Sequence, residues 1–227
     1  MKVLIFGASG MVGQGALLES LDAPDVSQVT LVGRARLERT HPKLQQLVCV
    51  DLMNVQSIEE ALRGFDACFF CVGVSSAGMT EDAYRHLTHD VTISVASTLS
   101  RLDPGMTFVY VSGAGTDSTE RGRTMWARVK GKTENDLRKL PFARVCLFRP
   151  SIIQPLNGIQ SKTGSYRLFY SLAKPFLPLA HTLFPRHVLT TAELGGAMLN
   201  AVRQGAGGVF EVADIASLAR GSRPSAA

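Results

Sequence analysis

Short apolar runs alternate with segments of helical periodicity over the first 150 residues. Runs rich in β-branched and aromatic residues predict strands at 2–6, 28–32, 47–50, 67–72, 107–112 and 144–148. Apolar residues at helical spacing predict helices at 16–21, 55–63, 80–102 and 124–140. The fourth strand is apolar throughout, as is typical of a parallel strand covered on both faces. The alternation predicts an α/β fold with a doubly wound parallel sheet.

The pattern loosens after Pro150, where turn-forming residues interrupt the regular alternation. We expect turns at 154–165, helices at 166–172 and 191–203, a strand at 209–212 and a flexible basic tail at 217–227. Residues 1–216 are therefore predicted to form a single domain, with a core at 1–150 and a small C-terminal substrate lobe at 151–216.

The composition is that of a globular chain. Of the 227 residues, 45% are hydrophobic and 19% are charged, which excludes disorder over most of the length. A membrane span needs ~18 uninterrupted apolar residues, and Lys174, Pro175 and Pro178 interrupt the most apolar later stretch. The apolar run at the N-terminus is shorter than the roughly 7–15 residues of a secretory signal. We therefore expect no transmembrane segment and a cytoplasmic location.

Charge is distributed unevenly along the chain. Residues 1–120 carry 8 basic and 14 acidic side chains, whereas residues 121–227 carry 16 basic and 5 acidic ones. The basic excess favours an anionic ligand or partner near the C-terminal half, with a solvated surface as the alternative. Because the chain has no basic run with interleaved aromatic residues, no nucleic-acid partner is expected.

The cysteines and histidines do not predict a metal site. Cys68 and Cys71 lie three apart in a predicted strand, where such side chains point to opposite faces. We interpret the four cysteines as small buried apolar residues under reducing conditions. His86 and His89 could share a helix face, but no carboxylate or cysteine cluster accompanies them at metal-site spacing.

A glycine-rich turn joins the first predicted strand to the first helix. It reads Gly7-Ala8-Ser9-Gly10-Met11-Val12-Gly13. Glycines three residues apart at such a junction allow a tight turn and bring the backbone close to a pyrophosphate at the helix N-terminus. The turn predicts a Rossmann-type dinucleotide site that includes Ser9, Met11 and Val12, and the alternative is close helix–strand packing without a ligand.

The end of the second predicted strand bears on the choice of dinucleotide. An NAD site usually places Asp or Glu there to accept from the ribose 2′-hydroxyl, whereas this chain has Arg34, followed by Arg36 and Arg39. Because a guanidinium pairs with a 2′-phosphate, NADP(H) is favoured over NAD(H). Asp51, followed by Leu52, is placed after the third strand to contact the adenine amino group, or it caps a loop.

Together these motifs resemble those of short-chain dehydrogenases/reductases of the extended or atypical kind. The resemblance rests on the glycine turn, Asp51, Cys71-Val72-Gly73, Ser112, Lys130 and Arg149-Pro150. The segment Val129-Lys130-Gly131-Lys132-Thr133-Glu134 and residues 190–198 are similar to the small Tat-interacting-protein-like NAD(P)-binding branch, often labelled nucleoside-diphosphate-sugar epimerases. The resemblance implies that Cys71, Val72, Gly73, Lys130 and Pro150 contact the cofactor.

The resemblance also implies a catalytic set, of which one member differs. In the family a serine polarises the substrate carbonyl, a tyrosine passes the proton, and a lysine four residues later binds the nicotinamide ribose. Ser112 and Lys130 match the serine and the lysine, but Trp126 occupies the tyrosine position. An indole N–H donates a hydrogen bond and is not an acid near neutral pH. Ser112, Trp126 and Lys130 are therefore the candidate catalytic residues.

Three functions remain open at this stage. The first is an NADP(H)-dependent reductase of a small carbonyl or related compound, with the proton supplied by water, Ser112 or Tyr166. The second is a catalytically weak NADP(H)-binding regulatory or redox-sensing protein. The third is a sugar-nucleotide epimerase, against which the missing tyrosine and the small substrate lobe both argue.

Large apolar residues near basic ones characterise residues 166–179. This segment is interpreted as a lid over an apolar substrate, as an interface for a partner or membrane surface, or as a helix packed on the sheet edge. His181 and His187 either contact the substrate or lie in a solvated loop. The expected partner is a small-molecule substrate, and a homodimer or a protein partner stays open.

Overall fold

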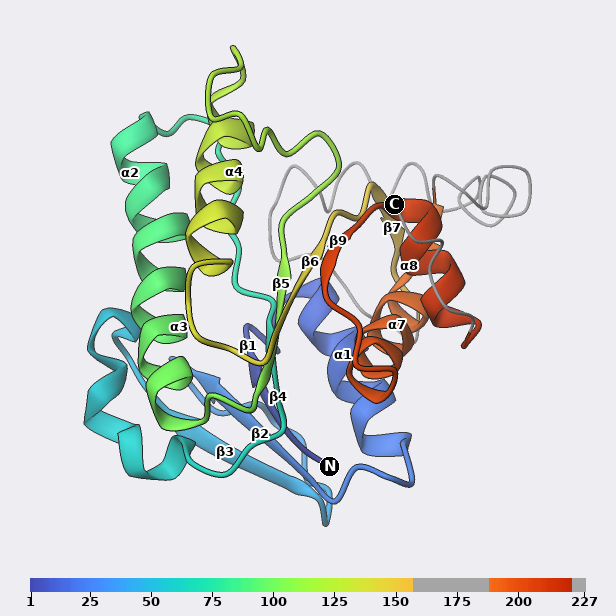
Figure 1. Ribbon diagram of the computed structural model, residues 1–227. Coiled ribbons are helices and arrows are strands. Elements are labelled where there is room, and N and C mark those ends of the chain that lie inside the picture. The colour runs from blue at the N-terminus through green and yellow to red at the C-terminus, as the bar shows by residue number, and fades with distance from the viewer. Residues whose placement is uncertain (157–187, 222–227) are drawn as a thin grey trace.

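A parallel β-sheet runs through the middle of the molecule, and helices cover both of its faces (Figure 1). The computed structural model describes residues 1–156 and 188–221, and within them seven strands form this sheet in the order β3-β2-β1-β4-β5-β6-β9. The strands are β1 (Lys2–Phe6), β2 (Gln28–Gly33), β3 (Leu44–Val48), β4 (Ala67–Phe70), β5 (Thr107–Val111), β6 (Arg144–Phe148) and β9 (Gly208–Phe210). The predicted doubly wound parallel α/β fold is confirmed.

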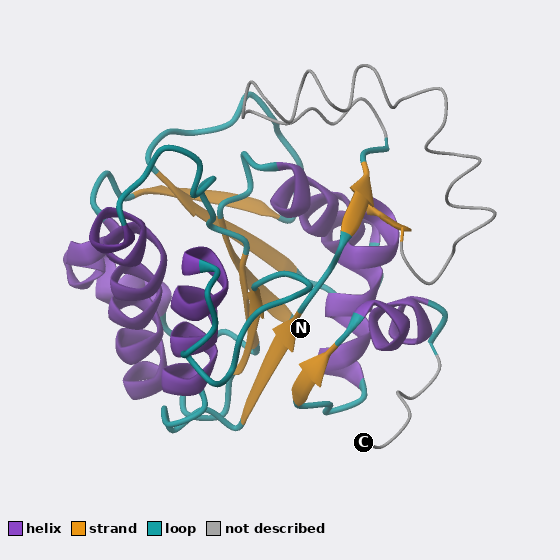
Figure 2. Ribbon diagram, turned by 90° about the horizontal axis from the view of Figure 1, so that it is seen from above, coloured by secondary structure: helices purple, strands orange, loops and turns teal. Residues whose placement is uncertain are grey.

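The helices form one layer on each side of the sheet, as the view from above shows (Figure 2). On one side lie α1 (Met11–Asp22), α7 (Thr191–Arg203) and α8 (Val212–Ala219). On the other side lie η1 (Leu52–Leu62), α2 (Glu81–Arg85), η2 (His86–Asp90), α3 (Val91–Leu102) and α4 (Met125–Leu137). This sheet between two helix layers is the arrangement that βα alternation dictates.

Strand side chains alternate between the two layers. Val3 and Ile5 of β1 join the core beneath α1, whereas Leu4 and Phe6 join the core on the opposite face, and all four are fully buried. Burial on both faces explains why these strands are apolar at nearly every position. The sheet therefore has a hydrophobic core on each face. The carboxyl ends of its strands are not part of these cores and are available to form a ligand site.

The strand order reverses at β1. Because β1 pairs with β2 on one side and with β4 on the other, the chain after β1 and the chain after β4 diverge into opposite helix layers. The divergence opens a crevice at the carboxyl ends of the strands, which is where open α/β sheets bind ligands.

The edge strand β3 begins three residues earlier than predicted. Its register with β2 runs from Val29↔Leu44 to Gly33↔Val48. Gln45 and Gln46 lie inside it, and their amide side chains bond to Gln28 and to the backbone of Leu37. A search for apolar runs misses an edge strand whose polar side chains are bonded in this way.

The predicted helices at 55–63 and 80–102 differ from those observed. The first is the 3₁₀ segment η1, which begins earlier because the Asp51 carboxylate accepts from the Met53 N–H at 2.9 Å. The second is continuous but contains the π-helical turn η2 between α2 and α3. His89 of this turn bonds to Asp136 of α4 at 2.9 Å, which ties the two helices together.

The described elements after residue 150 do not form the separate lobe that was predicted. Strand β9 is the last strand of the main sheet, and α7 packs on α1, so both belong with the core rather than with a separate lobe. The predicted tail from Ser217 is wrong at its start: α8 continues to Ala219 because Leu218 is fully buried. A small parallel pair, β7 (Ile152–Gln154) with β8 (Val188–Thr190), was not predicted.

Candidate functional site

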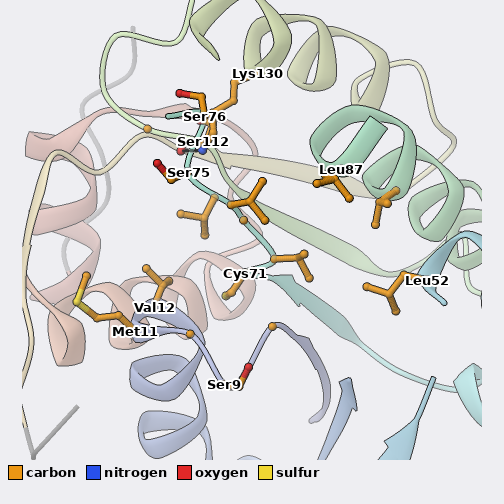
Figure 3. A pocket seen from close by; sticks show the side chains of 18 of the residues that line it. Ser9, Met11, Val12, Leu52, Cys71, Ser75, Ser76, Leu87, Ser112 and Lys130 are labelled. Carbon is orange, nitrogen blue, oxygen red and sulfur yellow. Dashed lines mark hydrogen bonds between the residues drawn. The ribbon is translucent and has the colours of Figure 1, made fainter. Parts of the chain in front are cut away.

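A cleft of about 1020 Å³ opens at the carboxyl edge of the sheet, at the reversal of strand order. Figure 3 shows Ser9, Met11 and Val12 from the first turn at one end and Lys130 beside Ser112 at the other, with Cys71 between them. Of the predicted site residues, the cleft is lined by Gly7, Ser9, Gly10, Met11, Val12, Arg34, Asp51, Leu52, Cys71, Val72, Gly73, Ser112, Trp126, Lys130 and Pro150. Segments more than 140 residues apart in the chain thus share one cavity.

The glycine turn presents backbone to the cleft. Gly7 has φ +79°, in the left-handed region that favours glycine, and its carbonyl accepts from the Gly10 N–H at 2.9 Å. Helix α1 begins at Met11, and no described side chain caps its first turn. Its N–H groups and the positive end of its dipole therefore point toward the cleft, as a pyrophosphate site requires.

Gly13, unlike Gly7 and Gly10, does not line the cleft. A Cβ at this position would sit 2.3 Å from the Gly7 carbonyl oxygen. Gly13 therefore allows α1 to pack closely on the turn, which is a packing role rather than the predicted ligand contact.

Both basic and acidic side chains line the β2 end of the cleft. Arg34 and Arg36 line a smaller adjoining cavity of about 260 Å³ next to the glycine turn, and Arg34 lines the main cleft as well. Arg39 lines neither cavity. Asp51 and Leu52 lie across the main cleft, where one Asp51 oxygen already accepts from the Met53 N–H.

Cys71, after β4, faces the middle of the cleft as a thiol. Burial raises its pKa to about 12, so it is not a thiolate nucleophile at neutral pH. Cys68 belongs to the core on the opposite face of the sheet. Ser75 and Ser76 follow in the same loop and also line the cleft. Their position depends on a loop path that no sequence pattern predicted.

The three candidate catalytic residues meet at the α4 end. Lys130 donates from Nζ to the backbone carbonyl of Ser112, at the end of β5. Trp126 lies one helical turn before Lys130, on the same face of α4, and lines the same cavity. The spacing of four residues thus places the indole where the family's tyrosine is expected.

The Ser112 hydroxyl is directed away from the cleft. It donates to a Glu134 carboxylate oxygen at 2.6 Å, and a second contact reaches the Phe148 carbonyl at 3.2 Å. A hydroxyl has a single proton to donate, so in this structure that proton is not offered to a substrate carbonyl. This arrangement differs from the polarising role that the family resemblance implies for Ser112.

Glu134 is the centre of a buried ionic network that was not predicted. Its side chain is fully buried and forms a two-point ion pair with Arg149, through Nε at 3.0 Å and Nη2 at 2.5 Å. Arg149 also contacts Ser118 at 2.6 Å and Glu211 at 3.1 Å. The sequence signal was present in the Lys-Gly-x-x-Glu spacing and in Arg149 before Pro150, but the pairing of the two appears only in the fold.

The position of Lys130 affects its acidity. Burial lowers the pKa of its ammonium from 10.5 to about 8, while the nearby Glu134 carboxylate opposes that change. The group is therefore charged at neutral pH and loses its proton at a modestly higher pH. Perturbed lysines in clefts are candidates for catalysis or anion binding.

Four further residues reach the cleft from the helical segment after Thr80. They are Tyr84, His86, Leu87 and Val91, of which His86 and Leu87 belong to the π-helical turn. Such turns concentrate at functional sites because they reorient side chains. Hydrophobic periodicity does not reveal a π turn. The predicted roles of Tyr166, His181, His187 and residues 166–179 lie outside the described residues.

Within residues 1–156 and 188–221, no three His, Cys, Asp or Glu side chains are grouped to hold a metal ion. No helix in the same ranges is both long enough and apolar enough to cross a membrane.

Comparison with known families agrees with this geometry. The profile described as NAD(P)H-binding matches residues 7–139, which is more than half of the chain. The chain belongs to the NAD(P)H-binding family. The matched region begins at Gly7 and ends after α4, so it includes the glycine turn, Arg34, Asp51, Ser112 and Lys130.

Individual proteins similar to this chain show which branch of the family it belongs to. Protein HTATIP2 of Rattus norvegicus is 30% identical over 155 residues, covering 67% of this chain and 62% of that protein. FMP52 of Saccharomyces cerevisiae, named mitochondrial, is 30% identical over 171 residues, covering 70% of this chain and 67% of that protein. The matches thus span about two thirds of the relatives' length, and they identify an atypical short-chain dehydrogenase/reductase, as the motifs indicated.

Solved structures share the fold at low sequence identity. The enzyme WbmF of Bordetella bronchiseptica in complex with NAD+ superposes with a TM-score of 0.69 at 15% identity, over 96% of this chain and 76% of that one. Uronate dehydrogenase of Agrobacterium tumefaciens gives 0.67 at 14% identity, over 99% and 84%. The family profile and the shared Rossmann-type fold together establish a nicotinamide dinucleotide-binding protein.

The expected cytoplasmic location is wrong by this comparison. Several relatives, including those of Aspergillus clavatus, Eremothecium gossypii and Saccharomyces cerevisiae, are named mitochondrial. The expectation rested on the lack of a secretory signal. That feature separates secreted proteins from others and does not distinguish the cytoplasm from an organelle.

Proposed function

We propose that the protein is an NADPH-dependent reductase of a small carbonyl compound. The observation that carries the proposal is one cleft that joins the glycine turn and Arg34 at one end to Lys130 and Trp126 at the other. A nicotinamide cofactor, when bound, supplies a hydride. The chain supplies the charges that bind the cofactor and a wall that shapes the substrate position.

Each part of the cleft suits one part of the dinucleotide. The N–H groups at the start of α1 would hold the pyrophosphate, since no described side chain occupies them. Asp51 would accept from the adenine amino group, with Leu52 beside it. Lys130 has donors that suit the nicotinamide ribose, and Pro150 with the backbone of Val72 and Gly73 would border the ring.

The preference for NADP(H) rests on the residue that follows β2. A carboxylate at this position would accept from a ribose 2′-hydroxyl, but Arg34 is a fixed cation. Arg36 lines the same adjoining cavity. Two guanidinium groups beside the glycine turn support binding of a 2′-phosphate and do not suit an unmodified ribose.

The cleft also has apolar walls. Val74, Leu87 and Ile152 are 38–42% exposed and line it, and Trp126 adds an aromatic surface. Apolar walls with a few polar groups are typical of sites for small organic molecules. They support a small carbonyl substrate more than a strongly hydrated sugar nucleotide.

A second candidate function has its own support. Trp126 replaces the family's acid, and the Ser112 proton is directed to Glu134. Both observations favour a protein that binds NADP(H) as a regulatory ligand and catalyses little. The two functions differ in a measurable way, because only the reductase consumes NADPH when a carbonyl compound is added.

The test is NADPH oxidation at its absorbance band with a panel of aliphatic and aromatic aldehydes and ketones. Binding is followed separately through Trp126, the single tryptophan of the chain, whose emission overlaps NADPH absorption. We expect carbonyl-dependent turnover on the order of 1 s⁻¹ or faster for the best substrate. Bound NADPH that no carbonyl oxidises would contradict the reductase and support the binding protein.

A further inference from the structure

Reduction of a carbonyl to an alcohol adds a hydride to carbon and a proton to oxygen, so the proposed reductase needs an acid. The indole N–H of Trp126 is not acidic near neutral pH. The Ser112 hydroxyl donates its hydrogen bond to Glu134 at 2.6 Å, and that carboxylate is held by Arg149. The two residues that the family motif places beside Lys130 are therefore unsuited to the task.

We propose that Lys130 is the general acid of this site, which rests on the reductase function proposed above. Its ammonium donates directly to the oxygen of the carbonyl under reduction. One Nζ–H bond breaks, one O–H bond forms, and the electron pair remains on Nζ as a neutral amine. Solvent then returns a proton to the amine, so each turnover consumes one hydride and one proton.

The geometry places the ammonium at the reacting end of the cleft. The Lys130 side chain descends from α4 to the end of β5, beside Ser112 (Figure 3). An ammonium has three donors, and in the described part of the chain Lys130 makes one hydrogen bond, to the Ser112 carbonyl. That bond fixes the direction of Nζ and leaves N–H groups for ligands in the cavity that Lys130 lines.

The groups around Lys130 keep it charged but ready to release a proton. Glu134 lies on the same helix, one turn further, and Arg149 from the end of β6 balances the Glu134 charge. Tyr84 of α2 lines the same cleft, and Tyr110 of β5 lies near Tyr84 and Glu134; both tyrosines are almost fully buried. Burial brings the pKa of Lys130 to about 8, within the range suited to acid catalysis near neutral pH.

Tyr84 is the competing acid. It lines the same cleft and is a phenol like the family's missing residue. Its side chain is only 2% exposed, whereas Lys130 is partly exposed to the cavity. We therefore assign the proton to Lys130 and treat Tyr84 as the alternative that the experiment must separate.

The first test replaces Lys130 by arginine, which keeps the charge and the donors but does not release a proton near neutral pH. Lys130→Arg is expected to bind NADPH within about threefold of wild type, measured through Trp126 fluorescence. Its kcat should fall by about 100-fold or more, the usual contribution of a general acid. The matched control is Lys132→Arg, whose lysine pairs with Asp136 away from the cleft and whose kcat should not change.

The second test measures the proton itself. The Lys130 resonance, assigned as the one missing in Lys130→Arg, is followed by ¹³C NMR of labelled lysine in the protein without cofactor. We expect its midpoint near pH 8, with kcat of the wild type falling above the same pH. A midpoint near that of a free lysine, together with kcat constant from pH 7 to 9, would overturn the proposal.

The outcomes separate this inference from the proposed function. If the wild type binds NADPH but none of the carbonyl compounds in the panel causes NADPH oxidation, the reductase function fails. If the wild type turns over and Lys130→Arg turns over equally, the assignment of Lys130 fails alone. A hundredfold loss in Tyr84→Phe, with Lys130→Arg fully active, would make Tyr84 the acid.

Discussion

The hydroxyl of Ser112, the residue after β5, donates to Glu134 in the last turn of α4 across 2.6 Å. Both side chains are buried, at 6% and 0% exposure. Arg149, which follows β6, completes the contact from a third element. This one network fixes β5, β6 and α4 relative to one another and thereby sets the position of Lys130 in the cleft.

The ion pair should be important for stability. Glu134→Gln leaves the guanidinium of Arg149, 12% exposed, with a neutral partner in place of a charged one. Removing one partner of a buried pair costs about 3–5 kcal/mol, and the remaining contacts of Arg149 favour the lower value. Urea unfolding should show this loss. Glu60→Gln, which removes an exposed partner of Arg63, should change the free energy of unfolding by about 0.5 kcal/mol or less, and an equally small effect at Glu134 would contradict the account.

Two adjacent glycines of α7 offer a matched pair. A Cβ at Gly195 would lie 2.8 Å from the Gly15 carbonyl oxygen of α1, whereas no described atom lies within 4 Å of one at Gly196. Gly195→Ala should therefore push α1 outward and destabilise the protein by about 1–3 kcal/mol. Gly196→Ala should stabilise it by about 0.5–1 kcal/mol.

Both variants are compared by urea unfolding and by NADPH titration. Because α1 carries the glycine turn, Gly195→Ala should also weaken NADPH binding, and Gly196→Ala should not. Equal stability of the two variants would contradict the claim that close packing of α1 on α7 requires glycine at position 195.

The buried ammonium of Lys130 should destabilise the folded protein at neutral pH, as is common for residues whose properties serve activity. Its pKa falls from 10.5 to about 8 on folding, so between these values the unfolded chain binds more protons and stability rises with pH. At pH 7 the buried charge costs on the order of 2 kcal/mol, allowing for its partial exposure. Lys130→Met should be more stable than wild type at pH 7, with an advantage that shrinks from pH 8 to 10.5. A difference that is constant with pH would contradict the shift.

A charge at the glycine turn should abolish cofactor binding without unfolding the protein. A Cβ at Gly10 meets its nearest described atom at 3.4 Å, and Gly10 is the N-cap residue of α1, where Asp and Asn are both favourable. Gly10→Asp places a negative charge where the pyrophosphate is expected, while Gly10→Asn has the same size without the charge. NADPH titration should show the larger loss for Asp, and unchanged affinity in Gly10→Asp would refute the placement.

The sequence predicted what depends on local pattern. Rules of strand, turn and helix geometry predict the apolar strand Lys2–Phe6, the glycine turn, and the shared helix face of Trp126 and Lys130, which are four residues apart. The direction of the Ser112 hydroxyl does not, because it depends on Glu134, 22 residues away. The same limit explains β3, whose glutamines are bonded to distant backbone, and the π-helical turn that brings His86 to the cleft.

The cofactor preference is measured most directly by titrating wild-type protein with NADPH and with NADH while following Trp126 fluorescence. A charge-assisted pair between Arg34 and a 2′-phosphate contributes on the order of 1.5–3 kcal/mol, so NADPH should bind roughly 10- to 150-fold more tightly. Arg34→Ala should lose most of this preference, and the double variant with Arg36→Ala the remainder. Equal affinity of the wild type for NADPH and NADH would contradict the assignment of this cleft to NADP(H).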